Sequence, residues 1–278
     1  MAGQEAAAGS GHSHAPDGTG PPPFVDTTVA HPARVYDYWL GGKDNYEADR
    51  VAAAEVVAAM PGIVPAVRAN RAFLRRAVQY LAGEAGIRQF LDIGTGLPTA
   101  DNTHEVAQAV APVSRIVYVD NDPIVLTHAR ALLTSCPEGA TAYIDADARD
   151  PARILSEAAR TLDFSRPVAV VMLAVMHFIP DADGPYQIVS QLMDAVPSGS
   201  YLIMSHATSD LDPAGAAAAD RYNARVATGM SPRTRAEISR FFDGLTLMEP
   251  GLVPLPQWRA LSNSAHPSTA YACVGRKS

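Results

Sequence analysis

The spacing of the apolar residues changes near residue 88. Over residues 46–60 and 68–86, apolar side chains recur every three or four positions with charged residues between them, which is typical of amphipathic helices. Beyond residue 88 the chain alternates short apolar runs with further helical stretches. The runs are rich in Val, Ile and Tyr, as buried parallel strands are, and they lie at 89–93, 115–120, 140–145, 167–173 and 200–205.

This alternation predicts an α/β fold with a doubly wound, mostly parallel sheet and an N-terminal helical extension. Two last β-like segments, at 245–249 and 269–276, bring the expected sheet to seven strands. Helix starts agree with the pattern, since Asp-Pro pairs at 122–123 and 150–151 fall where helices should begin, as does the capping-box spacing of Thr234 and Glu237. The predicted organisation is a disordered tail over 1–27, a helical lead-in or lid over 28–86, and the doubly wound domain over 87–278.

Composition narrows the classes of partner. Hydrophobic residues make up 47% of the 278 positions, which is enough for a substantial core. The net charge of −7, with only 22 Lys and Arg, disfavours nucleic acid and anionic membranes as partners and favours a small molecule. No run approaches the roughly 18 apolar residues of a membrane span, and the tail lacks the apolar core of a signal peptide.

The cysteines and the tail histidines add little chemistry. Cys136 and Cys273 lie far apart and form no CxxC pair, so we predict neither a disulfide framework nor a cysteine zinc site. The reducing cytoplasm is the expected location. His12 and His14 are interpreted as incidental, and no metal site is predicted.

The segment FLDIGTGLPTADN at 90–102 carries the strongest sign of a ligand. In a doubly wound sheet the ligand lies beyond the carboxyl end of the first strand, and Gly94 and Gly96 would let the backbone approach it. A nicotinamide fingerprint would need a third glycine at Thr99, and Asp92 would repel a pyrophosphate. The acidic residue instead favours a ligand with a cationic end, and S-adenosylmethionine, which carries an ammonium and a sulfonium, meets this requirement.

Two further strand ends extend this site along a nucleoside. Asp120, in YVDND, is placed to accept hydrogen bonds from both ribose hydroxyls. Asp147, in YIDAD, is placed to accept from the adenine amino group, and the Ala148 N–H to meet a ring nitrogen. Asp122 and Asp150 are interpreted as helix caps. The predicted cofactor-binding residues are Asp92, Gly94, Thr95, Gly96, Asp120, Asn121, Asp147, Ala148 and Leu173.

The motifs D-x-G-x-G, VDND and DAD together resemble class I S-adenosylmethionine-dependent methyltransferases. Longer segments, among them HPARVYDYWLGGKDNYEADR, DIGTGLPTADNTHEVAQ and VMHFIPDAD, are similar to an actinobacterial methyltransferase family long labelled a domain of unknown function. The resemblance covers nearly all of Thr28 to Lys277 and implies a Rossmann-like class I methyltransferase fold, with 87–278 as the S-adenosylmethionine-binding domain. Pro98 replaces the third glycine of D-x-G-x-G-x-G, so the turn is expected to differ in shape.

His177 is the candidate general base. Its segment MLAVMHFIPDAD is similar to the LHDWPDE-like segment of small-molecule O-methyltransferases, in which the matching histidine is the general base, although FI stands here in place of DW. An ordinary imidazole pKa of about 6.5 suits that role, and a purely structural histidine is the alternative. Candidate substrate residues are Tyr36, Tyr38 and Asn45 in the lead-in, which could equally pack on the domain as part of a helix, and His206 at the end of the fifth run, for which a structural role is favoured.

The leading hypothesis is an enzyme that transfers a methyl group to an oxygen or nitrogen of a small-molecule acceptor, in specialised metabolism. A non-catalytic S-adenosylmethionine sensor or partner-binding protein would use the same pocket, and a nicotinamide-dependent oxidoreductase is the second alternative. The chain lacks the G-x-S-x-G elbow of hydrolases and the PP-aromatic ending of amino-methylating nucleic-acid enzymes. The acceptor, its nucleophilic atom and the oligomeric state, for which a homodimer is considered, stay open.

Overall fold

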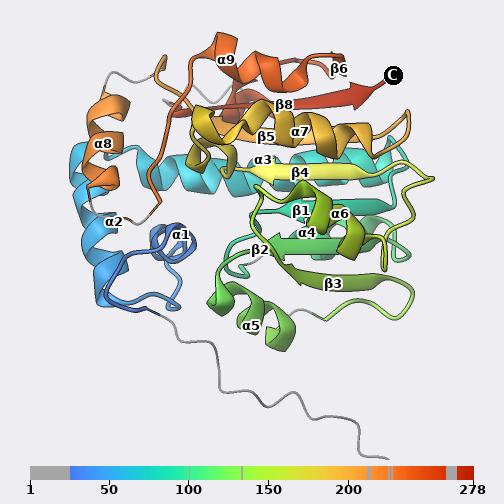
Figure 1. Ribbon diagram of the computed structural model, residues 1–278, viewed down its shortest axis with the longest axis horizontal. Coiled ribbons are helices and arrows are strands. Elements are labelled where there is room, and N and C mark those ends of the chain that lie inside the picture. The colour runs from blue at the N-terminus through green and yellow to red at the C-terminus, as the bar shows by residue number, and fades with distance from the viewer. Residues whose placement is uncertain are drawn as a thin grey trace, which may run out of the picture.

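The central sheet has the strand order β3-β2-β1-β4-β5-β8-β6 (Figure 1). Strands β1 to β5 are parallel, and β8 is antiparallel to β5 and β6, which confirms the predicted mostly parallel, doubly wound sheet. A further strand, β7, also pairs with β8 and was not predicted, because two residues are too short to show a periodicity. The strands are β1 Gln89–Ile93, β2 Arg115–Asp120, β3 Ala140–Asp145, β4 Ala169–Leu173, β5 Tyr201–Ala207, β6 Leu245–Leu247, β7 Val253–Pro254 and β8 Ala270–Lys277.

The protein is seen in a computed structural model that describes residues 26–99, 101–132, 134–211, 214–224, 226, 228–260 and 268–278. The predicted tail therefore lies almost wholly outside the described residues, and so do His12 and His14. The helices within them are α1 Pro32–Leu40, α2 Glu47–Ala59, α3 Ile63–Gly83, α4 Thr103–Val110, α5 Pro123–Leu132, α6 Pro151–Ala158, α7 Pro185–Asp194, α8 Ala214–Asn223 and α9 Arg235–Ser239.

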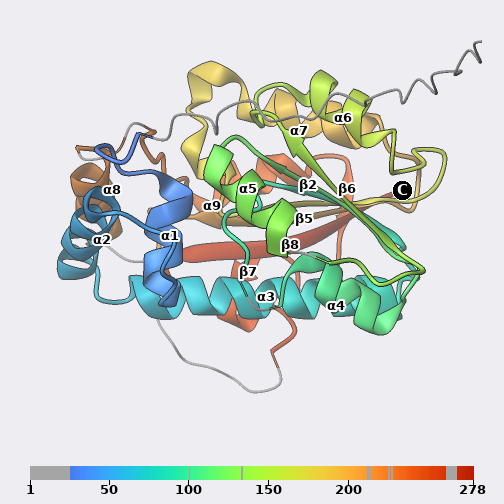
Figure 2. The ribbon, with the colours of Figure 1, turned by 90° about the horizontal axis from the view of Figure 1, so that it is seen from below.

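Helices cover both faces of the sheet (Figure 2). Phe90 and Leu91 are neighbours in β1 and point to opposite faces, as strand geometry requires. Phe90 joins a core with Phe73 of α3 and other residues of α3 and α4, whereas Leu91 joins a core with Ile154 of α6 and Ile188 of α7. The near-continuous apolar runs of the sequence follow from this burial on both sides.

Helices α1, α2 and α8 gather at the end of the sheet toward which the parallel strands point (Figure 1). Trp39 of α1, Val56 of α2 and Tyr222 of α8 share a third apolar core, which Val67 of α3 also joins. These helices therefore lie over the carboxyl ends of the strands, where doubly wound sheets bind their ligands. Of the described helices, none alone is long and apolar enough to cross a membrane, and α2 and α3 reach that length and composition only as a pair bent by 103°.

The predicted helix starts are confirmed. Asp122 and Asp150 each accept a hydrogen bond from a backbone N–H in the first turn of α5 and α6. Thr234 and Glu237 form a reciprocal capping box at the start of α9. Each cap satisfies N–H groups that have no partner inside the helix, so these short polar residues fix where the helices begin.

Candidate functional site

A cavity lies between the carboxyl ends of β1 to β5 and the helices α1, α2, α3 and α8. Two residues that were predicted to bind substrate, Tyr38 and Asn45, are not part of its lining. The other predicted residues line it, and they are Asp92, Gly94, Thr95, Gly96, Asp120, Asn121, Asp147, Ala148, Leu173, His177, His206 and Tyr36.

Asn45 belongs to a turn built around a buried carboxylate. Asp37 Oδ2 accepts hydrogen bonds from Asn45 Nδ2 at 2.9 Å and from Asp44 N at 3.0 Å. Gly42 packs so closely that a Cβ there would lie 1.9 Å from Asp37 Oδ1. Tyr38 is 39% exposed on the outside of α1. The positions of Tyr38 and Asn45 therefore give no support to the expected substrate roles, because this segment folds the lead-in instead.

Asp92 is buried at the end of β1. Its Oδ2 accepts a hydrogen bond from Thr103 Oγ1 at 2.6 Å. Burial raises the pKa of Asp92 to about 6, against the opposing effects of the Thr103 hydrogen bond and the Arg71 charge. A cation in the cavity would favour the ionised carboxylate, because it offsets the cost of desolvating that charge.

The two glycines of the first turn have different tasks. Gly94 has a φ of 73°, and a Cβ there would lie 2.5 Å from the Val175 side chain, so this glycine lets the turn pack against the segment after β4. Gly96 has a φ of 68°, and no described atom lies within 4 Å of where its Cβ would be. Of the two, Gly96 is therefore the one whose missing side chain leaves open space.

Asp120 and Asp147 differ in their surroundings. Asp120 is buried at the end of β2 and accepts hydrogen bonds from two backbone N–H groups, one of them Gly96 N at 2.8 Å. Burial raises its pKa. Asp147 follows β3, is more exposed, and pairs with Arg149 Nη1 at 3.1 Å, a partner that the sequence did not reveal. Asn121 Nδ2 donates to Asp147 at 3.3 Å, which links the ends of β2 and β3.

His177 follows β4 in a short 3-10 helix, η1 (Met176–Phe178). The turn between them contains Ala174, whose φ of 55° is rarely adopted by a residue with a side chain. Ala174 N donates to Ser205 Oγ at 3.0 Å, which holds this turn against β5. The chain thus bends sharply after β4 and brings His177 to the cavity.

The His177 imidazole is buried and neutral at pH 7. It is 6% exposed and lies beside the Phe178 ring, with the two centroids 4.4 Å apart. Burial, together with His206 and Arg233, holds the pKa of His177 well below its ordinary value. Its Nδ1 accepts a long hydrogen bond of 3.4 Å from Ala207 N.

Arg233 holds the His177 segment by hydrogen bonds to its backbone carbonyls. Its guanidinium is 3% exposed, with Nη1 donating to Met176 O at 3.0 Å and Nη2 to Ile179 O at 2.8 Å. These carbonyls lie on either side of His177. Nη2 also donates to Asp181 Oδ1 at 2.7 Å. Arg233 was not predicted, and it is the residue that fixes the conformation of this loop.

His206 has no free ring nitrogen. Its Nε2 lies 2.9 Å from Arg233 Nη1, which is always a donor, and its Nδ1 lies 2.7 Å from Ala207 O, which is always an acceptor. The ring is therefore the neutral tautomer with the proton on Nδ1. Burial lowers the pKa of His206 to about 4. Both nitrogens are occupied, so a substrate can touch only the ring carbons, and the structural role that the sequence left open accounts for this residue.

A buried polar chain joins the lead-in to β5. Tyr36 Oη donates to Val67 O at 3.2 Å and accepts from Asn70 Nδ2 at 3.0 Å, and Ser205 Oγ donates to Asn70 Oδ1 at 2.7 Å. Tyr36, Asn70 and Ser205 all line the cavity. Asn70 and Ser205 were missed. Asn70 lies on the apolar stripe of α3 between Val67 and Leu74, and a polar residue inside such a stripe is a signal that could have revealed it.

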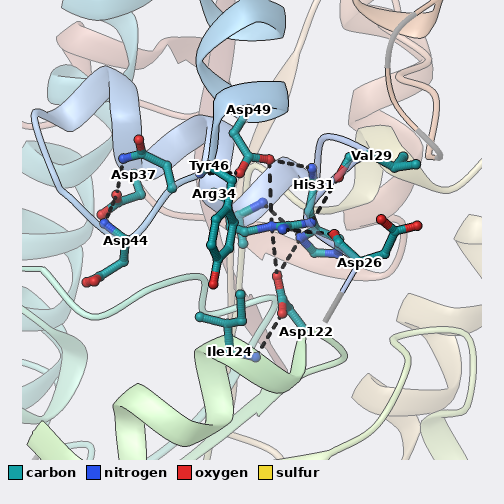
Figure 3. Close-up of polar contacts among 12 residues, drawn as sticks. Asp26, Val29, His31, Arg34, Asp37, Asp44, Tyr46, Asp49, Asp122 and Ile124 are labelled. Atoms are coloured by element: carbon teal, nitrogen blue, oxygen red, sulfur yellow. Dashed lines mark hydrogen bonds and ion pairs between the residues drawn. The ribbon is translucent and has the colours of Figure 1, made fainter. Parts of the chain in front are cut away.

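The start of α1 is fastened to the start of α5 (Figure 3). His31 Nδ1 lies 2.9 Å from Asp122 Oδ2, and Arg34 Nε lies 3.8 Å from the same oxygen and 3.6 Å from Asp49 Oδ1. Burial alone would raise the pKa of Asp122, but His31 and Arg34 hold it below its usual value. We call these contacts of His31 and Arg34 with Asp122 the latch. Because His31 also lines the cavity, the latch holds the first turn of α1 against the site, next to Asp120.

The Asp122→Asn variant tests the latch, because asparagine caps helices as well as aspartate but carries no charge. We expect the free energy of unfolding at pH 7 to fall by about 1 to 3 kcal/mol, since Arg34 stays buried with one carboxylate fewer. The lowered pKa of Asp122 gives a stabilisation that is present above the unfolded value of about 3.9 and is lost as the pH falls through the folded value. The difference between the two proteins should therefore close in acid.

The matched control for this variant is Asp150→Asn. Asp150 also caps its helix, α6, but contacts no residue of the N-terminal lead-in among its described hydrogen bonds. Its replacement should change the free energy of unfolding by no more than about 0.5 kcal/mol. Urea titration measures both variants. Equal losses would show that the ion pairs of Asp122 add nothing to its role as a cap.

The strand order and the acid-lined cavity at the strand ends define a Rossmann-like fold that binds a nucleoside cofactor. The chain belongs to the S-adenosyl methyltransferase family, whose model matches residues 19–278. It is similar to a DUF574 family protein from Streptomyces avermitilis MA-4680, with 49% identity over 91% of this chain and 99% of that one and a TM-score of 0.87. It is also similar to a candidate methyltransferase from Thermobifida fusca YX, with 43% identity over 92% of this chain and 98% of that one and a TM-score of 0.85. No curated protein matches the chain.

The cofactor of this family is S-adenosylmethionine, as the motifs predicted. The residues of the cavity fit it. Asp92 is a buried carboxylate that a cationic group would stabilise, Asp120 is a fixed acceptor, and Gly96 leaves open space between them. These features suit a nucleoside with a cationic amino-acid end better than a pyrophosphate.

Proposed function

We propose that this protein transfers a methyl group from S-adenosylmethionine to an oxygen or nitrogen of a small-molecule acceptor. The observation that carries the proposal is the continuity of the cavity, whose lining runs from Asp92 and Asp120 to His177. A cofactor held at the strand ends would share one space with the imidazole and with the walls formed by α1, α2 and α8. Alignment is the main task of such a site, because the methyl group arrives already activated.

The assignment of residues follows their chemistry. When bound, S-adenosylmethionine supplies an electrophilic methyl group and is left as S-adenosylhomocysteine. We assign Asp92 to its ammonium, Asp120 to its ribose hydroxyls, and Asp147 with the Ala148 N–H to its adenine ring. The neighbouring wall is formed by Thr95, Asn121 and Leu173.

His177 is the proposed base for a hydroxyl acceptor. As the acceptor oxygen takes up the methyl group, its proton would pass to Nε2 of the neutral imidazole, once the ring has given up the hydrogen bond from Ala207 N and carries its own proton on Nδ1. The lowered pKa makes this ring a weak base, so it suits an acidic hydroxyl such as a phenol better than an aliphatic alcohol. An amine acceptor that enters in its neutral form needs no base. Of the predicted substrate residues, we keep Tyr36, whose ring would contact the acceptor at the cavity wall.

Two alternatives differ in what they need from the cavity. A non-catalytic sensor would use the same cofactor contacts without turnover, and only the detection of a methylated product separates it from the enzyme. A nicotinamide-dependent oxidoreductase is disfavoured by the family and by Thr99, which stands where the fingerprint needs glycine. Cys136 and Cys273 are free, which supports the cytoplasm as the proposed location.

Calorimetry with S-adenosylmethionine and S-adenosylhomocysteine tests the cofactor assignment. We expect Asp120→Ala to weaken binding by about tenfold to a hundredfold, which corresponds to the loss of charge-assisted hydrogen bonds. The matched control is Asp145→Ala, because Asp145 pairs with Asp120 in the sheet register but is exposed and lies outside the cavity lining. Asp145→Ala should bind within about twofold of the parent. Failure of the parent to bind either ligand would refute the proposal.

A further inference from the structure

The cavity has two regions of different chemistry. The cofactor region lies at the ends of β1, β2 and β3 and contains Asp92, Gly96, Asp120 and Asp147. The acceptor region lies between η1 and the helices α1, α2, α3 and α8. Its apolar lining belongs to one packed cluster, and it includes Trp39, Val56, Met60, Val67, Phe178 and Tyr222.

Formal charge is confined to the cofactor region and the loop beside it. Among the described lining residues, the Asp and Arg side chains are Arg71, Asp92, Asp120, Asp147 and Arg149. Three are the strand-end carboxylates, and Arg149 pairs with Asp147 at 3.1 Å. Arg71 donates at 2.9 Å to a backbone carbonyl in the loop after β1, and its charge acts on Asp92 and also on Tyr36.

Four titratable groups of the acceptor region are neutral at pH 7. Burial raises the pKa of Tyr36 and Tyr222 and lowers the pKa of His177 and His206. Two polar groups of the wall also have partners within the protein. Trp39 Nε1 donates to a carbonyl of α2 at 3.2 Å, and the Tyr36 hydroxyl both donates and accepts. Among the described residues, the lining of the acceptor region thus carries no Asp, Glu, Lys or Arg of its own, and the cations nearest to it, Arg71 and Arg233, already donate to carbonyl groups of the protein.

We propose that the acceptor region binds an uncharged, mainly apolar molecule whose nucleophilic hydroxyl is the polar group presented to His177. This inference rests on the proposed function and narrows its substrate class. A carboxylate, phosphate or ammonium on the acceptor would leave water without an oppositely charged side chain of this wall to pair with, which is strongly unfavourable. Contact with the Trp39, Met60 and Phe178 surfaces favours binding of apolar area instead.

Binding of matched phenols to the S-adenosylhomocysteine-loaded protein tests the inference. The probes are 4-hydroxybenzamide and 4-hydroxybenzoate, which have nearly the same shape but differ in charge, with methyl 4-hydroxybenzoate as a more apolar neutral probe. We expect both neutral probes to bind at least tenfold more tightly than the carboxylate at pH 7. Calorimetry or ligand-observed NMR measures these affinities without any need for turnover.

A cation placed in the wall should remove most or all of this preference. Met60 is buried in the acceptor region at the end of α2, so the Met60→Lys variant brings a cation to the lining. We expect its affinity for 4-hydroxybenzoate to rise at least tenfold over the parent, whereas 4-hydroxybenzamide changes less than threefold. Met60→Gln adds polarity without charge and should not recruit the carboxylate. If Met60→Lys fails to fold, the comparison of probes on the parent protein still decides.

The outcomes separate this inference from the proposed function. If S-adenosylhomocysteine binds but the carboxylate probe binds as well as the amide, or no neutral phenol binds at millimolar concentration, the acceptor class is wrong and the cofactor assignment stands. If S-adenosylhomocysteine does not bind, the proposed function fails. The same probe comparison on the cofactor-free protein then decides whether this wall prefers uncharged ligands.

Discussion

The Arg233→Met variant is expected to lose most of its turnover and about 3 to 5 kcal/mol in the free energy of unfolding. Methionine fills a similar volume but donates no hydrogen bond. The carbonyls of Met176 and Ile179 and the Nε2 of His206 would then be left without their buried donor. The loop that carries His177 would lose its fixed shape, and a base displaced by even 1 Å can cost about a hundredfold in rate.

A pH profile separates positioning by Arg233 from simple loss of stability. Arg233 is one of the causes that lower the pKa of His177, so its removal should raise that pKa. The acidic limb of kcat/KM should therefore move to higher pH in Arg233→Met, a change that unfolding alone does not produce. Denaturant titration and rates per folded molecule measure the two effects independently.

Arg240→Met is the matched control for this variant. Arg240 is exposed and lies over the Tyr186 ring at 4.1 Å, a ring that Arg233 also faces at 5.8 Å. Its replacement removes a cation–π contact without exposing a buried carbonyl, and should cost no more than about 1 kcal/mol with an unchanged pH profile. If Arg233→Met keeps normal turnover per folded molecule and an unmoved profile, Arg233 contributes only packing and the positioning role is wrong.

The convergence of Asp92 and Asp120 at one edge of the sheet could be predicted from the sequence because its signals are local. Asp92 and Asp120 each end an apolar run, and parallel strands bring their carboxyl ends to one edge of the sheet. The caps at Asp122 and Asp150 are also local, since each bonds an N–H only two or three residues away. Short-range chemistry of this kind does not depend on how the rest of the chain packs.

The acceptor side could not be predicted because it is assembled from distant segments. Asn70 meets Ser205 across 135 positions, and Arg233 meets Met176 across 57. Helical periodicity shows that Asn70 lies on a buried face but not which residue it contacts. Likewise, the sequence places Gly94 next to a ligand, whereas the structure shows that it makes room for Val175 from another strand end.

The lead-in illustrates the same limit. Its segment YDYWLGGKDN mixes aromatic and polar residues, and such a mixture is compatible with a substrate lid and with a structural turn. Asn45 belongs to a structural turn, because its side chain donates a hydrogen bond to the buried carboxylate of Asp37 and it is not part of the cavity lining. Tyr36, two positions from Tyr38, faces the opposite way and lines the cavity. Helix geometry separates these two tyrosines by about 200°, so the direction of α1 had to be known first.

Replacing His177 with alanine is expected to slow the methylation of a hydroxyl acceptor by about 10² to 10⁴. Affinity for S-adenosylmethionine should stay within a few-fold, because His177 belongs to the proposed acceptor region and not to the strand ends assigned to the cofactor. With an amine acceptor the loss should be small, since no proton has to be removed before attack. Steady-state rates and calorimetry on the same preparation measure these effects.

The pH dependence of this variant has a definite sign. Because the pKa of His177 is held well below 6.5, the proton-accepting form predominates at pH 7 and is lost only as the pH falls through that lowered value. The parent kcat/KM should thus be flat above pH 6.5 and decline only in more acidic solution, and His177→Ala should lack this limb. The unfolded chain takes up the proton first, so His177 also costs the parent stability as the pH falls below 6.5.

The His177→Gln variant decides whether the imidazole acts as a base or only as a hydrogen-bonding group. The hydrogen bond from Ala207 N occupies Nδ1 and favours the tautomer with its proton on Nε2, so accepting a proton at Nε2 requires the ring to give this bond up. At 3.4 Å the bond is long, and its loss should cost no more than about 1 kcal/mol. Glutamine can bond Ala207 N and donate to the acceptor, but it cannot take up a proton near neutral pH. If the imidazole acts as a base, His177→Gln should be as slow as His177→Ala. If His177→Gln keeps most of the parent rate, the imidazole only orients the acceptor, and alignment alone carries the reaction.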